Sequence, residues 1–173
     1  MSDPGLLATA LQVRADAGAR DPWLKGVPIV GIGWATVELE RAAEDLDGAF
    51  NRAGMPQPAW TPAPRDDLLG ATAWVSREWW PTWGADDPPA IVLLEPDTEG
   101  RLAATLAKFA EGVGAIYVAP RPDHPPGRID AARLGRSTPG PLGSGRILLA
   151  RPAWGPNVIV LDRPMHAGRQ GGP

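Results

Sequence analysis

The middle of the chain, residues 91–118, places the strongest constraint on the fold. Short apolar runs at both ends of this stretch predict buried strands. Between the two runs, Leu102, Leu106 and Phe109 recur at the spacing of one helix face, and Gly112 follows at the expected helix end. The stretch therefore predicts a strand–helix–strand unit, which we interpret as the junction between two similar halves of the chain.

The segments on either side of this junction also alternate between strand and helix patterns. Asp97 or Thr98 is expected to cap the central helix. Crossovers do not recur regularly enough for a doubly wound parallel sheet, so the order predicts a mixed α+β fold of two related halves. The other predicted elements are strands at 29–37, 69–76, 146–150 and 157–161, a short edge strand near Trp60, a helix at 39–50 and a weak helix at 129–134.

The composition limits the class of protein. The chain has 173 residues, of which 43% are hydrophobic and 21% charged, a balance typical of one globular domain with a sizeable core. A net charge of −3 gives no reason to expect a nucleic-acid partner. No apolar run approaches the roughly 18 residues that span a bilayer, and the N-terminus lacks a signal-peptide pattern. We therefore expect a cytoplasmic protein without a membrane partner. The absence of cysteine excludes disulfides and Cys-ligated metals.

Tryptophan is enriched, with eight copies, five of them between Trp60 and Trp83. Large flat indole rings suit a planar or hydrophobic ligand. Packing in the core and in proline-rich loops is the alternative, and it is the simpler explanation for any single tryptophan. The tryptophans that we nominate as ligand-binding residues are Trp34, Trp74, Trp79 and Trp80.

Several motifs occur in the order found in one known superfamily. Leu93-Leu94-Glu95-Pro96 ends the first half, and Ala110-Glu111-Gly112 leads into the second half. Residues 30–46 match a first strand with its helix, and residues 145–162 match a last hairpin. Over residues 28–164 the chain resembles the vicinal oxygen chelate superfamily, which includes glyoxalase I, bleomycin-resistance proteins and, as the most similar branch, methylmalonyl-CoA epimerase. The resemblance implies two βαβββ modules whose curved mixed sheets enclose a central pocket.

The resemblance also implies a division of the chain and a partner. Family members often pair modules or chains, so a homodimer is expected. The predicted segments are an N-terminal extension at 1–26, a first module at 27–97, a linking helix with the second module at 98–164, and a disordered tail at 165–173.

The metal site is where the chain departs from the superfamily. Metal-dependent members place a His in the first strand of each module and a Glu in the final strand. The matching positions are Gly31 or Ile32, Ala115 and Val160, none of which has a nitrogen or oxygen donor in its side chain. We therefore expect no metal and no other cofactor.

Three residues are candidates for proton transfer: Glu95, Tyr117 and Asp123. Tyr117 would share a strand face with Ala115 and so face the pocket, although a core tyrosine with a satisfied hydroxyl is an equal alternative. Glu95 is more simply explained as a structural acceptor, and Asp123 as part of a solvated loop. Arg146 is a candidate for holding an anionic group, with surface solvation as its alternative.

These observations favour a metal-independent protein that binds a hydrophobic or aromatic small molecule in order to sequester or sense it. Two alternatives remain open. One is a metal-independent isomerase or lyase that uses a carboxylate or Tyr117 for proton transfer. The other is a degenerate module that serves only as a dimerisation scaffold.

Overall fold

The computed structural model describes residues 12, 15, 19, 24, 27–54, 57–76, 89–119, 133–149 and 156–162. The expected tail at 165–173 and most of the expected helix at 129–134 lie outside these residues. Only isolated positions of the expected extension at 1–26 are described, and one of them, Leu24, is buried in the core. Neither of the two helices named below is long and apolar enough to cross a membrane.

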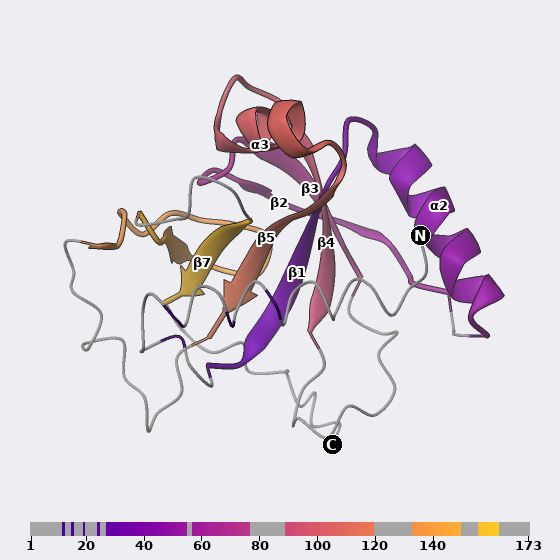
Figure 1. Cartoon of the computed structure of the whole chain (residues 1–173), viewed down its shortest axis with the longest axis horizontal. Coiled ribbons are helices and arrows are strands. Elements are labelled where there is room, and N and C mark those ends of the chain that lie inside the picture. The colour runs from indigo at the N-terminus through magenta and orange to yellow at the C-terminus, as the bar shows by residue number, and fades with distance from the viewer. Residues whose placement is uncertain are drawn as a thin grey trace, which may run out of the picture.

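Within the described residues, one curled, seven-stranded mixed sheet carries the helices α2 and α3 (Figure 1). The strand order across the sheet is β2-β3-β4-β1-β5-β7-β6. The strands are β1 (Ile29–Ala35), β2 (Thr61–Asp66), β3 (Ala71–Ser76), β4 (Ala90–Pro96), β5 (Gly112–Val118), β6 (Gly145–Ile147) and β7 (Asn157–Leu161). The helices are α2 (Leu39–Arg52) and α3 (Arg101–Phe109).

The two halves of the sheet repeat the same pairing pattern. In the first half, β1 pairs in parallel with β4, which pairs antiparallel with β3. In the second half, β5 pairs in parallel with β7, which pairs antiparallel with β6. The halves meet where β1 and β5 run antiparallel. The mixed α+β fold of two related halves expected from the sequence is therefore confirmed, with residues 91–118 at the junction.

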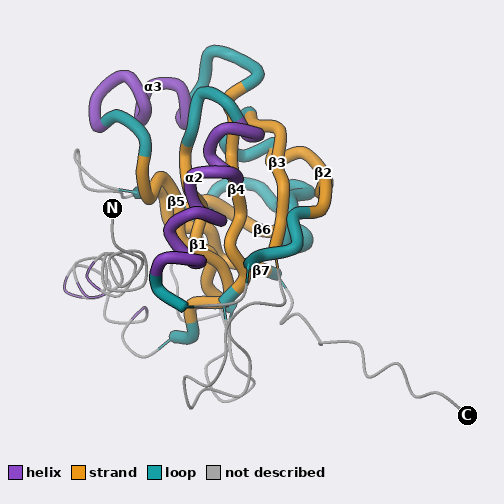
Figure 2. Tube along the Cα trace, turned by 90° about the vertical axis from the view of Figure 1, so that its right-hand side faces the viewer, coloured by secondary structure: helices purple, strands orange, loops and turns teal. Residues whose placement is uncertain are grey.

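The face of the sheet that carries α2 forms one core cluster, which we call the outer face. Leu39, Ala42, Ala43, Leu46 and Phe50 line one side of α2 and are buried there. This spacing places an apolar stripe against the strands, and α2 lies along the sheet in Figure 2. The outer-face strand residues in the same cluster include Ile32, Ile91, Leu93, Ile116, Val158 and Val160.

The opposite face, which we call the inner face, carries many small side chains. Ala71, Ala73, Ala90 and Ala115 belong to its core cluster. Larger side chains fill the space above them, among them Leu102 from α3, Tyr117 from β5, and Leu142 from the segment before β6. In this way α3 closes one end of the sheet, and the chain just before β6 covers its middle.

The cap predicted for the central helix was wrong. The helix α3 begins at Arg101 with Gly100 as its N-cap, and no side chain caps it. Asp97 instead accepts two hydrogen bonds from Arg65, at 2.7 and 2.8 Å. A two-point guanidinium–carboxylate pair is stronger than a single cap hydrogen bond. The backbone N–H of Leu102, in the first turn of α3, instead donates to the carbonyl oxygen of Leu69 at 3.4 Å.

Candidate functional site

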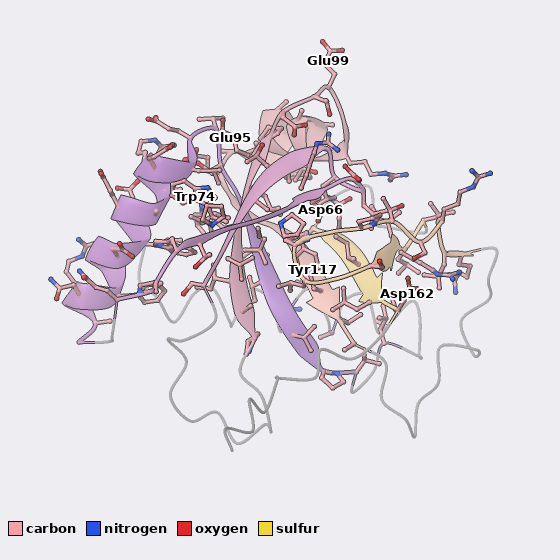
Figure 3. All side chains as sticks on the ribbon, turned by 180° about the vertical axis from the view of Figure 1, so that it is seen from behind. Asp66, Trp74, Glu95, Glu99, Tyr117 and Asp162 are labelled. Atoms are coloured by element: carbon pink, nitrogen blue, oxygen red, sulfur yellow. The ribbon has the colours of Figure 1, made fainter. Side chains whose placement is uncertain are left out.

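A carboxylate and a phenol meet at the inner face. The hydroxyl of Tyr117 donates to Oδ2 of Asp66 at 2.7 Å, and Figure 3 shows the two side chains together. Oδ1 of Asp66 accepts the backbone N–H groups of Leu68 and Leu69, both at 3.1 Å. Asp66 and Tyr117 are each only 1% exposed. This is a buried polar pair beside the mostly apolar side chains of the inner face, where Asn157 is a further buried polar residue.

Local structure explains how the pair forms. Asp66 is the last residue of β2, and its side chain caps the turn that follows, as aspartate does in Asx turns. Gly70 closes the turn with φ +68°, and its N–H donates to the carbonyl oxygen of Asp66 at 2.8 Å. Tyr117 lies two residues after Ala115 on β5, so both side chains point to the inner face. The shared face predicted for Tyr117 and Ala115 is confirmed, whereas a role for Tyr117 in binding or catalysis stays a prediction.

Burial governs the electrostatics of the pair. Burial raises the pKa of the Asp66 carboxyl, and hydrogen bonds from Tyr117, Leu69 and Leu68 oppose that rise. Burial, and then the neighbouring Asp66 carboxylate, raise the pKa of the Tyr117 hydroxyl well above its usual value. Tyr117 is therefore held as a neutral donor. Three donors compensate for the cost of burying the Asp66 carboxylate.

Leu142 covers the pair from the segment before β6. Its side chain is 3% exposed and lies so close to β1 that a Cβ at Gly31 would be 2.3 Å from Leu142 Cδ1. The same Cβ would lie 3.1 Å from Cδ2 of Tyr117. Gly140 passes over Asp66, since a Cβ built on Gly140 would lie 3.9 Å from Asp66 Oδ2. Gly31 thus provides the space that Leu142 fills.

Glu95 lies on the other face of the sheet. Its Oε2 accepts the N–H of Leu39, the first residue of α2, at 2.9 Å. A carboxylate at this position compensates for the positive end of the helix. Because the sheet separates Glu95 from Tyr117, the two candidates cannot act on the same ligand atom. The third candidate, Asp123, lies outside the described residues.

The described tryptophans lie on the outer face. Trp34 and Trp74 both pair across the strands with Leu93 and pack against the core cluster under α2. Trp60 packs there as well, and its Nε1 donates to Asp47 Oδ1 at 3.0 Å. Trp79 and Trp80 lie outside the described residues. Ligand binding by Trp34 or Trp74 stays a prediction, but it would use a different face from Tyr117.

Arg146 is exposed on β6, and its Nε lies 3.0 Å from Asp162 Oδ1. An anionic ligand would have to compete with this carboxylate for the guanidinium group.

The positions that the superfamily resemblance assigns to a metal do not fit a divalent cation. Gly31 and Ala115 lie at the inner face, but neither has a donor atom in its side chain. Val160 belongs to the outer-face core, whereas Ile159 and Leu161 are the inner-face residues of β7, and none of the three has a donor atom in its side chain. Among the described residues, no three His, Cys, Asp or Glu side chains group closely enough to hold a metal ion.

A surface groove lies outside the sheet, beside α3. It is a groove of about 490 Å³ lined by Val37, Pro96, Ala103, Leu106, Ala107, Ala110 and Glu111. Oε1 of Glu111 at its rim accepts the hydroxyl of Thr36 at 2.7 Å and the N–H of Val37 at 2.9 Å, and it also accepts from Arg41. The only charged group lining this groove is therefore already engaged in holding the turn between β1 and α2.

Sequence reasoning missed Asp66. The signal that was available is an Asp at the end of a predicted edge region, followed four residues later by a Gly, which is typical of an Asx-capped turn. The partner, Tyr117, is 51 residues away in the chain. Three strands separate β2 from β5 in the sheet, so only the curl of the whole sheet brings the two side chains together.

The curled mixed sheet with its repeated halves gives the chain a glyoxalase-like α+β fold. It is similar to a methylmalonyl-CoA epimerase solved with methylmalonyl-CoA and NH4+, with a TM-score of 0.58 and 17% identity over 80% of this chain and 99% of that one. A methylmalonyl-CoA epimerase from Mycobacterium tuberculosis aligns with a TM-score of 0.52 and 15% identity over 77% and 87% of the two chains. A hypothetical protein from Bacillus halodurans C-125 aligns with a TM-score of 0.55 and 16% identity over 83% and 99%.

These likenesses establish the fold. The similarity to methylmalonyl-CoA epimerases expected from the sequence motifs is therefore confirmed at the level of the fold. No family model matches the sequence, and no curated protein matches it.

Proposed function

We propose that the chain is a metal-independent binding protein for a small molecule with an apolar part and a polar part. The ligand lies on the inner face, with its polar part at the Asp66–Tyr117 pair. The observation that carries this proposal is a buried carboxylate that accepts a phenol hydrogen bond beside the apolar inner-face cluster. Buried ionisable groups with shifted pKa values, in a fold that curls around them, are typical of functional sites.

The surroundings of the pair support an apolar ligand body. Ala115, Ala73 and Leu142 belong to the same inner-face cluster as Tyr117. A hydrophobic ligand gains free energy by removing such surface from water, and one or two placed polar groups then fix its orientation. Sequestration or sensing follows from this chemistry, because binding of this kind needs no reacting group. We place the protein in the cytoplasm as part of the same proposal.

A metal-independent isomerase or lyase is the second candidate, and the raised pKa of Asp66 favours it. A carboxylate with a raised pKa is a stronger base and suits the removal of a proton from carbon. In that reaction Asp66 takes the proton from carbon. Once protonated, Asp66 no longer needs the Tyr117 hydroxyl as a donor, and that hydroxyl turns to donate to the ligand oxygen on which negative charge develops. Glu95 takes no part because it lies on the outer face.

The test combines a ligand screen with a turnover assay on the wild-type protein. Small molecules with one polar group, together with methylmalonyl-CoA, are screened by thermal shift and tryptophan fluorescence. Exchange of carbon-bound hydrogen in deuterated water is then followed for each compound that binds. Binding without exchange supports the proposed function, and exchange that Asp66→Asn abolishes supports the second candidate. If the whole panel fails to bind, both are wrong and the scaffold alternative remains.

A further inference from the structure

We infer that Leu142 occupies the place of the ligand's apolar part, and that a ligand enters when the hairpin tip carrying Leu142 withdraws. The site exposed in this way selects a compact branched molecule with a hydrogen-bond donor, such as an alcohol, and rejects a carboxylate. This inference rests on the proposed function, whose ligand class and mode of entry it specifies.

Leu142 lies over the part of the inner face that contains Tyr117. Its side chain belongs to the same cluster as Tyr117 and lies directly over the backbone of Gly31. Asp66 and Tyr117 form the floor beneath this part of the inner face. Removal of the leucine side chain would leave a space over Gly31 and the Cβ–Cδ2 side of the Tyr117 ring, and Gly140, two residues earlier in the same tip, lies over Asp66 Oδ2. An apolar cavity of this kind accepts small molecules of matching size.

Leu142 is carried by the tip of a hairpin. Residues 134–138 and 145–148 pair antiparallel, with reciprocal backbone hydrogen bonds of 2.9 and 3.0 Å between Thr138 and Gly145. Residues 139–144 form the tip, which has Gly140 and Gly143 on either side of Pro141-Leu142. Gly143 has φ +114°, a conformation that favours glycine. Residues 139–143 can therefore swing away while the Thr138–Gly145 pairing and the hydrogen bond from the N–H of Asp162 to the carbonyl oxygen of Ser144, at 2.9 Å, stay intact.

The hydrogen-bonding capacity of Asp66 and Tyr117 decides which ligand the site accepts. The Tyr117 hydroxyl proton is used by Asp66 Oδ2, while the Tyr117 oxygen keeps acceptor capacity. The exposed floor therefore offers acceptors, and a ligand with a hydroxyl or amino donor matches it. A ligand carboxylate would face the Asp66 carboxylate in a site with little water, where like charges repel strongly.

The experiment uses Leu142→Ala with isobutanol, isobutylamine and isobutyrate as probes, because each has the branched carbon skeleton of the deleted side chain. Leu148→Ala is the matched control: it removes the same atoms from the same hairpin, but Leu148 is buried in the outer-face cluster. Affinities are measured by calorimetry and by the probe-dependent rise in melting temperature. We expect isobutanol to bind Leu142→Ala at least about tenfold more tightly than it binds the wild type or Leu148→Ala.

Two further comparisons test selectivity. Isobutylamine is expected to bind Leu142→Ala and isobutyrate is not, and adding Asp66→Asn to Leu142→Ala is expected to weaken isobutanol binding about tenfold. If cyclopentane binds as tightly as isobutanol and Asp66→Asn has no effect, the cavity is purely apolar and the inferred ligand class is wrong. If Leu142→Ala does not fold, Leu142→Val is measured in the same way, because it removes only one carbon.

Failure of this inference is distinguishable from failure of the proposed function. If the wild type binds a compound from the ligand screen but Leu142→Ala binds it no more tightly, Leu142 does not compete with ligand and the inference is wrong, while the proposed function stands. If no probe binds Leu142→Ala and no compound binds the wild type, both are wrong.

Discussion

Tyr117 is the only tyrosine in the chain, and its hydroxyl is committed to one carboxylate. Tyr117→Phe removes this donor and leaves Asp66 Oδ2 buried without it. A buried acceptor that loses its partner costs about 1–3 kcal/mol. We therefore expect the free energy of unfolding in urea to fall by about that amount. A double-mutant cycle with Asp66→Asn isolates the coupling, and additive effects would contradict a direct interaction.

The raised pKa of Asp66 predicts a specific pH dependence. Because the folded state holds the Asp66 proton more tightly than the unfolded chain does, this group's contribution to stability is fully present below its ordinary value of 3.8 and is lost as pH rises through the folded pKa. Hydrogen bonds from Arg65 lower the pKa of Asp97, which acts in the opposite direction. The difference in unfolding free energy between wild type and Asp66→Asn removes such background terms. It should shrink as pH rises from about 4 towards neutrality, and a constant difference would contradict the raised pKa.

Substitution of Glu95 distinguishes a structural role of this residue from a role in ligand binding or turnover. Glu95→Gln keeps an acceptor for the N–H of Leu39 but removes the charge at the start of α2. Charges at helix ends contribute about 0.3–1 kcal/mol, so we expect a loss of stability of that size in chemical denaturation. Binding of any inner-face ligand should not change, and a loss of binding or turnover would show that Glu95 acts at the site.

At the scale of elements, the substitution of glycine by alanine should have opposite effects on stability at two positions, Gly33 and Gly48. A Cβ at Gly33 in β1 would lie 2.9 Å from Cβ of Ala115, which cannot rotate away, so the strands themselves must move. Overpacking of this kind costs about 1–3 kcal/mol. A Cβ at Gly48 in α2 would meet only the flexible end of Arg52, at 3.3 Å. Gly48→Ala should therefore stabilise the fold by about 0.5–1 kcal/mol, while Gly33→Ala destabilises it, both measured by urea unfolding.

The elements are also where sequence reasoning succeeded most. The apolar stripe of α2 and the junction at 91–118 depend on periodicity within a short segment, so they were predicted closely. The predicted last strand, 157–161, matches β7. The predicted cap of the central helix was wrong because the side chain of Asp97 has a distant partner: it pairs with Arg65, 32 residues away. The Asp66–Tyr117 pair was missed for the same reason, since its two halves come from strands that are not neighbours in the sheet.

At the scale of the whole molecule, both edges of the sheet are protected. The β2 edge carries Pro62 and Pro64, which cannot donate to a further strand. At the other edge, β6 is flanked by residues 134–138 through bridges at Leu134–Leu148 and Thr138–Gly145. The expected homodimer, which is still a proposal, should therefore not form by extending the sheet. Light scattering gives its mass, and hydrogen exchange at 61–66 should be unchanged by dimerisation; new protection there would contradict this.

The Asp66–Tyr117 pair beneath Leu142 is the feature from which both proposals start, and one optical titration tests it. The chain has a single tyrosine, so tyrosinate absorption in the near ultraviolet reports Tyr117 alone. In the folded protein no tyrosinate should form as pH passes through the ordinary pKa of 10.0, and it should appear only at higher pH or on unfolding. Tyrosinate formation at the ordinary pKa in folded protein would contradict a buried phenol held by Asp66.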